Sequence, residues 1–124
     1  MILIEKEDVY AFDVDDTLVL WGTADYAKPS PSLVEFHDPY DGTTVYLRPH
    51  ERHIKLLKQM SGRGRFVIVW SQAGAKWAQE VVKTLGLERY VDLIITKPHG
   101  YVDDLPCEAW LRNRIFIEEY SADE

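Results

Sequence analysis

The sequence has a single cysteine, Cys107, and no long run of apolar residues. One cysteine excludes an intrachain disulfide and a metal site built from several thiolates, and this scarcity is typical of a reducing compartment. No apolar run approaches the roughly 20 residues of a membrane-spanning helix, and residues 1–8 lack a basic region followed by a long apolar stretch. We therefore expect a cytoplasmic protein with no membrane contact.

Positive charge is also scarce, with 14 basic against 21 acidic residues and a net charge of -7. Proteins that hold long nucleic acids usually do so with a basic surface that releases counterions. Extended DNA or RNA binding is therefore disfavoured, whereas a site for one phosphate or for a nucleic-acid end remains compatible. The 124 residues predict one domain, residues 1–124, with a single core, and they carry no signal for an oligomeric state.

An apolar strand is expected over residues 9–14. It carries Asp13 near its end and is followed directly by Asp15, Asp16 and Thr17. Clustered carboxylates repel one another and lose hydration as they approach a core, so a positive partner is needed. No basic residue is near in sequence, and oxygen ligands on a short loop favour Mg²⁺. The alternative is a solvated turn or a helix N-terminus capped by Thr17.

The spacing of the acidic residues suggests chemistry. Residues two apart in a strand point to the same side, so Asp13 and Asp15 can face one pocket. One carboxylate can then attack a phosphorus atom to form an aspartyl-phosphate while the other transfers protons. We expect Asp16 to be turned away as a turn or capping residue.

Strand and helix patterns alternate along the chain. The Pro- and Gly-containing residues 21–32 predict a loop, and Asp41-Gly42 between two β-prone runs predicts a hairpin. The alternation predicts a three-layer Rossmann-like fold, a parallel sheet with helices on both faces, in which residues 21–47 form an inserted loop and small hairpin flap. The expected later strands are 66–70, 92–96 and 114–118, and the expected helices are 50–60, 75–85 and 106–112.

Ligands bind at the carboxyl ends of the strands in such folds. The polar residues that stand at these ends are Asp13 and Asp15, Ser71, Lys97, and the pair Asp103 and Asp104.

This ordered set resembles the haloacid dehalogenase superfamily of phosphotransferases over the whole chain. The first motif, DxDx[TV], is matched by residues 13–17 (DVDDT), and the second, an apolar strand ending in Ser or Thr, by residues 66–71 (FVIVWS). Lys97 matches the third motif, and residues 101–104 (YVDD) match the fourth, an acidic pair after a short apolar strand. Only about one helix separates the second and third motifs, so the chain is similar to the capless members.

The resemblance implies a catalytic role for four residues. Asp13 would be the nucleophile and Asp15 the general acid and base. Ser71 would donate a hydrogen bond to the phosphoryl oxygens, and Lys97 would offset the negative charge of nucleophile and phosphate. Phosphoryl transfer requires little beyond this positioning and charge neutralisation.

The resemblance also implies a Mg²⁺ ion held by the Asp13 carboxylate, the Asp15 backbone carbonyl and Asp104, with Asp103 supporting Asp104. We further expect the substrate to contact Thr17, Gln72 and Arg48.

Simpler roles compete with three of these assignments. Ser71 could cap the following helix, Lys76 could replace Lys97, and Asp103-Asp104 could begin a helix whose dipole favours them.

The sequence thus predicts a Mg²⁺-dependent phosphomonoesterase that acts on a nucleotide or another small phosphorylated metabolite. The alternatives are a polynucleotide 3'-phosphatase, to which residues 47–49 (LRP) also show a short resemblance, a phosphoprotein phosphatase, and a catalytically silent binding module. Dehalogenase activity is disfavoured because Asp15 suits phosphoryl chemistry.

Overall fold

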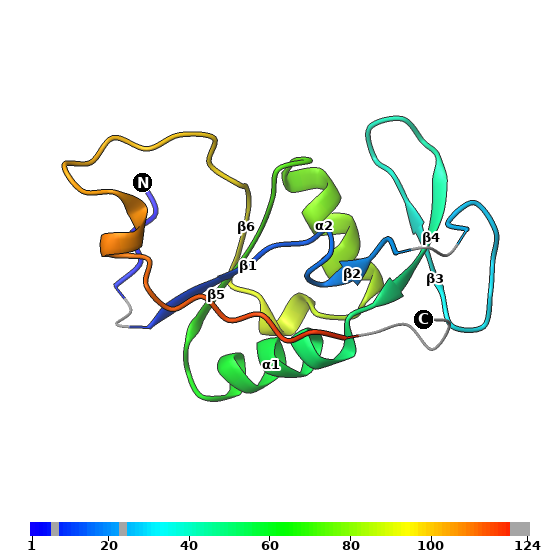
Figure 1. The fold of residues 1–124 in the computed structure, drawn as a ribbon, viewed down its shortest axis with the longest axis horizontal. Helices are drawn as coiled ribbons and strands as arrows, with labels where there is room; N and C mark the ends of the chain where they lie inside the picture. The colour runs from blue at the N-terminus through cyan, green and yellow to red at the C-terminus, as the bar shows by residue number, and fades with distance from the viewer. Residues whose placement is uncertain (6–7, 23–24, 120–124) are drawn as a thin grey trace.

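The computed structural model describes residues 1–5, 8–22 and 25–119 (Figure 1). Within them, no helix is both long and apolar enough to cross a membrane. The strands are β1 (Val9–Phe12), β2 (Val19–Leu20), β3 (Val34–His37), β4 (Thr44–Pro49), β5 (Phe66–Ser71) and β6 (Leu93–Thr96). The helices are α1 (Glu51–Gly62) and α2 (Ala75–Thr84), with short 3-10 turns η1 (Glu88–Tyr90) and η2 (Cys107–Ala109).

Three strands form a parallel sheet in the order β1-β5-β6. Their apolar runs pack into a core with α1 and α2, whose buried residues recur at helical spacing. α1 buries Ile54, Leu57 and Met60, and α2 buries Trp77 and Val81. The parallel pairing brings the carboxyl ends of β1, β5 and β6 to one edge, as the sequence predicts.

The prediction of a three-layer Rossmann-like fold with helices on both faces is wrong. The described residues contain two helices and two separate three-stranded sheets, one parallel and one antiparallel. Both crossovers advance in the same direction, from β1 to β5 and from β5 to β6. Right-handed crossovers that advance in one direction place their helices on the same face, so this strand order supplies no helix layer for the other face.

The antiparallel sheet has the order β2-β4-β3. The predicted hairpin is present as β3 and β4, but β4 continues to Pro49 and pairs with β2, immediately after the acidic turn. The expected small flap is therefore one part of a larger sheet. Its last strand leads straight into α1, which His50 caps by accepting a hydrogen bond from the His53 amide.

The C-terminal predictions are also wrong. The helix expected at 106–112 is a single 3-10 turn, and residues 114–118 and 101–102 form no strand. Leu111, Ile115 and Phe116 remain about half exposed. Alternating apolar residues favour a strand only where a partner edge is available, and these segments find none among the described strands.

The hairpin is docked against α2. Phe36 of β3 meets Trp77 edge to face with ring centroids 6.0 Å apart, and the His37 amide donates to the Glu80 carboxylate at 3.2 Å. At the hairpin tip, the Tyr40 side chain lies directly over Gly74, the residue before α2, whose φ is +118°. A side chain at Gly74 would overlap the Tyr40 phenol.

We expect Gly74→Ala to destabilise the fold through both backbone strain and this overlap. Strain alone costs about 1–3 kcal/mol, because a φ of 118° with a ψ of 159° is adopted almost only by glycine, and overpacking adds about 1–3 kcal/mol. Urea denaturation of the two proteins measures the sum.

Gly42→Ala is the matched control, because Gly42 has φ +77° but open space around it. It should show only the cost of strain. Combining Gly74→Ala with Tyr40→Ala should recover the overlap part of the loss. Equal losses for Gly42→Ala and Gly74→Ala would contradict the docking of Tyr40 on Gly74.

Candidate functional site

In the turn after β1, one backbone carbonyl accepts hydrogen bonds from three amides. The Val14 oxygen accepts hydrogen bonds from the amides of Thr17, Leu18 and Val19 at 3.1, 2.8 and 3.2 Å. Val14, Leu18 and Val19 are fully buried. The apolar residues thus anchor the turn in the core, and the carboxylates on either side of Val14 are held at its surface.

Asp16 belongs to the turn itself, as the sequence predicts. It has φ +59°, a left-handed conformation that Asp tolerates better than most residues. Its amide donates to the Val19 carbonyl at 2.7 Å, and its exposed carboxylate accepts from the Trp21 amide at 3.1 Å.

Asp13 and Lys97 meet across the edge where β1 and β6 end. The Lys97 Nζ lies 4.0 Å from the Asp13 Oδ1, and each side chain is 35% exposed. Burial raises the pKa of the Asp13 carboxyl above its ordinary value, although Lys97 and a hydrogen bond from the Val14 amide lower it. The charges of Asp15 and Asp16 raise it further.

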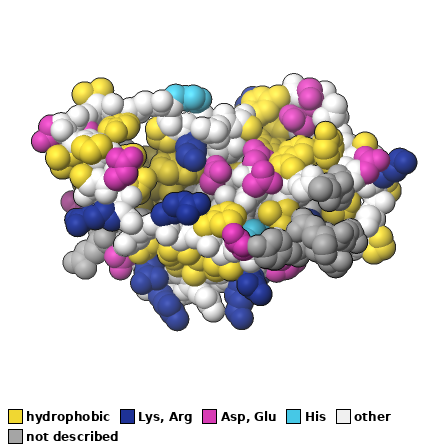
Figure 2. Space-filling model, in the orientation of Figure 1, with side chains coloured by type: hydrophobic (Ala, Val, Ile, Leu, Met, Phe, Trp, Pro, Cys, Tyr) yellow, Lys and Arg dark blue, Asp and Glu magenta, His cyan; other side chains and the backbone are white. Residues whose placement is uncertain are grey.

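Figure 2 shows acidic side chains gathered near the middle of this face, where β1 and β6 end beside α2, with a basic side chain next to them. The competing Lys76 instead lines a pocket with Pro39, Glu80 and Lys83, none of which is a predicted site residue.

Ser71 ends β5 at the same edge, but its side chain is buried. Its Oγ accepts a hydrogen bond from the Ala73 amide at 3.1 Å, and its carbonyl accepts from the Lys97 amide at 2.9 Å. In this arrangement Ser71 shapes the turn before α2 and fixes the start of the Lys97 segment. Gln72, which follows it, is exposed.

Asp103 and Asp104 are not brought to this edge. They lie exposed in the loop after β6, where Asp103 accepts a hydrogen bond from the Leu105 amide at 3.0 Å. Figure 1 shows this loop leading away from the end of β6 toward the N-terminus. Within the described part of the chain, no three His, Cys, Asp or Glu side chains are grouped so that they could hold a metal ion.

The predicted substrate contacts Thr17 and Arg48 lie beside the acidic turn. Arg48 pairs with Leu20 in the β2–β4 ladder, half-buried. The Thr17 carbonyl lies 2.8 Å from the Nδ1 of His53.

Two tryptophans bind Asp15, a contact that the sequence did not predict. The indole nitrogen of Trp21 lies 2.9 Å from the Asp15 Oδ1, and that of Trp77 lies 3.0 Å from the same oxygen. Trp77 was expected only as an apolar residue of α2, because helical periodicity does not register its N–H group.

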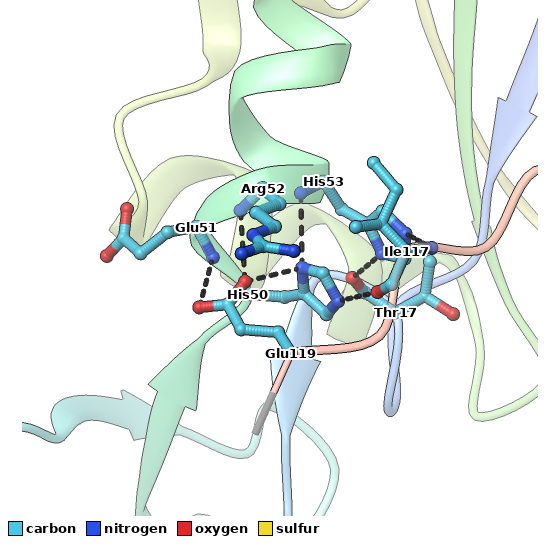
Figure 3. A network of polar contacts seen from close by, with 7 residues as sticks. All are labelled: Thr17, His50, Glu51, Arg52, His53, Ile117 and Glu119. Atoms are coloured by element: carbon cyan, nitrogen blue, oxygen red, sulfur yellow. Dashed lines mark hydrogen bonds and ion pairs between the residues drawn. The ribbon is translucent and has the colours of Figure 1, made fainter. Parts of the chain in front are cut away.

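Two buried histidines lie next to Thr17 of the turn (Figure 3). His50 and His53 stack with ring centroids 3.7 Å apart. His53 donates from Nδ1 to the Thr17 carbonyl, and its Nε2 accepts from the Ile117 amide at 2.9 Å. The His50 Nε2 donates to the Ile117 carbonyl at 2.8 Å. The pair thus links the acidic turn to the C-terminal segment.

Glu119 completes this network at the N-terminus of α1. Its carboxylate accepts from the amides of Glu51 and Arg52 at 3.3 and 3.0 Å and lies 3.0 Å from the His50 Nδ1 (Figure 3). A carboxylate at this position is stabilised by the unpaired amides of the first helical turn.

No family model, curated protein or solved structure matches the chain.

The free energy of unfolding should fall as the pH drops below about 6.5, the ordinary pKa of histidine. Burial lowers the pKa of His53 in the folded protein. A proton on Nε2 would also face the Ile117 amide, which donates to that atom. The unfolded chain then binds a proton that the folded chain resists, so stability is complete above pH 6.5 and declines below it. Urea denaturation at pH 7.5 and pH 5.5 measures the change.

His53→Gln should reduce this pH dependence, and His99→Asn, which alters an exposed histidine, should leave it unchanged. A wild-type slope that persists in His53→Gln would show that another group causes it.

Proposed function

We propose that the chain is a phosphomonoesterase of haloacid dehalogenase type that forms an aspartyl-phosphate on Asp13. The observation that carries the proposal is the pairing of the half-buried Asp13 carboxylate with Lys97, at the strand edge that also presents Asp15. Lys97 offsets the charge that accumulates when a phosphate approaches a carboxylate. A half-buried site strengthens this attraction relative to water.

The reaction has two balanced halves. In the first, an Asp13 oxygen attacks phosphorus, the bond from phosphorus to the leaving oxygen breaks, and the protonated Asp15 gives its proton to that oxygen. In the second, a water attacks the phosphorus of the aspartyl-phosphate, and Asp15 takes a proton from it. The bond between Asp13 and phosphorus then breaks, which releases inorganic phosphate and restores both carboxyl groups.

Magnesium dependence is part of this proposal. Asp13 suits a Mg²⁺ ligand, since it is an oxygen donor whose charge is incompletely offset by Lys97. A bound Mg²⁺ would supply further neutralisation of the phosphoryl charge. Asp103 and Asp104 stand apart from Asp13, so the present arrangement fits this ion only in part, and no step above is routed through it.

Two aromatic side chains beside the site, Trp21 and Tyr26, favour a nucleotide or another flat small substrate. Trp21 lies against Asp15, and Tyr26, half exposed, meets it edge to face with ring centroids 5.1 Å apart. Exposed aromatic rings of this kind can stack on a base.

Asp13→Asn should abolish hydrolysis of para-nitrophenyl phosphate, because an amide oxygen is a poor nucleophile, and should leave the circular dichroism spectrum unchanged. Asp15→Asn should lower kcat by about 10²–10⁴-fold, the usual contribution of a general acid or base.

In the same assay, a chelator should abolish the activity of the wild type, and added Mg²⁺ should restore that activity.

Asp41→Asn is the control for both variants. It changes an exposed carboxylate in the turn between β3 and β4, which is not part of the site. It should remain active. Turnover retained by Asp13→Asn, or a folded wild type that is inactive with Mg²⁺ on this ester and on nucleotides, would leave the chain as a binding module.

A further inference from the structure

Asp15 is held by two indole groups that approach the same oxygen. Its Oδ1 accepts a hydrogen bond from Trp21, which follows β2, at 2.9 Å and from Trp77, on α2, at 3.0 Å. Trp77 is only 5% exposed, so its N–H group cannot exchange this partner for bulk water without cost.

Both indole N–H groups bind the Oδ1 of Asp15, so the two oxygens of this carboxylate have different environments. An indole N–H can only donate, and a carboxylate oxygen accepts along about two lone-pair directions. With both directions on Oδ1 occupied, a proton on the Asp15 carboxyl is accommodated on Oδ2. From this geometry, and resting on the proposed function, we propose that Trp21 and Trp77 are positioning residues that reserve the Asp15 Oδ2 for proton transfer.

Each indole is itself fixed by neighbours. Trp77 packs edge to face on Phe36 of the hairpin, at an interplanar angle of 64°. The backbone of Trp21 is tied to the Asp16 carboxylate, and its ring contacts Tyr26. The antiparallel sheet therefore takes part in orienting the catalytic acid, through the residue that docks it on α2.

With this arrangement, both proton transfers of the reaction use the Oδ2 of Asp15. The leaving oxygen receives the proton from the Oδ2 of Asp15 as its bond to phosphorus breaks. In the second half, the attacking water gives its proton to the same Oδ2. Through both halves the Oδ1 keeps its two N–H donors, which hold the plane of the carboxyl group.

The test is to compare Trp21→Phe and Trp77→Phe on two esters of similar size, phenyl phosphate and para-nitrophenyl phosphate. Phenolate leaves poorly without a proton, whereas nitrophenolate needs little help. The ratio kcat/KM reports the step in which the leaving group departs. Loss of an indole N–H should lower kcat/KM for phenyl phosphate by about tenfold or more, and for para-nitrophenyl phosphate by less than about threefold.

Trp110→Phe, an exposed tryptophan outside this cluster, is the matched control and should change neither value. Trp21 is partly exposed, so Trp21→Phe tests the idea even if Trp77→Phe folds poorly. Equal losses on both esters, or no loss, in a folded Trp21→Phe would overturn the positioning role while leaving the proposed function standing. A folded wild type that hydrolyses neither ester, nor nucleotides, in the presence of Mg²⁺ would overturn both.

Discussion

The site depends on the tight turn that the Val14 carbonyl organises by accepting three backbone amides. The chain bends within a few residues in this turn, while the side chains of Val14, Leu18 and Val19 stay in the core. The carboxylates of Asp13 and Asp15 are thereby forced to the surface at the end of β1, where they repel each other. Burial raises the pKa of Asp13, and Lys97, which follows β6, opposes that effect. The fold thus maintains an electrostatically unfavourable cluster, which suits a reactive site better than a structural one.

Three separate parts of the chain hold this turn. The His50 amide donates to the Leu18 carbonyl at 2.9 Å, and His53 donates to the carbonyl of Thr17. β2 pairs with the end of β4 directly after the turn. On its outer side, the indoles of Trp21 and Trp77 hold the Asp15 carboxylate. A change in the hairpin, in the first turn of α1 or in the C-terminal segment would therefore reach the carboxylates through one or two contacts.

The sequence was sufficient to predict the parallel strands β1, β5 and β6 and the positions of Asp13 and Lys97 at their common edge, because apolar runs in parallel strands end there. It was not sufficient for the segments whose partners are distant. The apolar step before Asp103 has two residues, too few to specify which strand edge it joins. His50 and His53 stand at the start of a predicted helix, yet their partner Ile117 is more than 60 residues away, which no local pattern reveals. Helical periodicity classed Trp77 correctly as buried and could not reveal what its N–H group binds.

The most direct test of the account is to find the phosphoryl group on the protein. The chain is mixed with para-nitrophenyl phosphate and Mg²⁺, quenched in acid, digested and mapped by mass spectrometry. The account predicts phosphate on the peptide that contains Asp13, more of it in Asp15→Asn, whose aspartyl-phosphate hydrolyses slowly, and none in Asp13→Asn. Phosphate on another residue, or turnover without any phosphorylated peptide in Asp15→Asn, would contradict the assignment of Asp13 as the nucleophile.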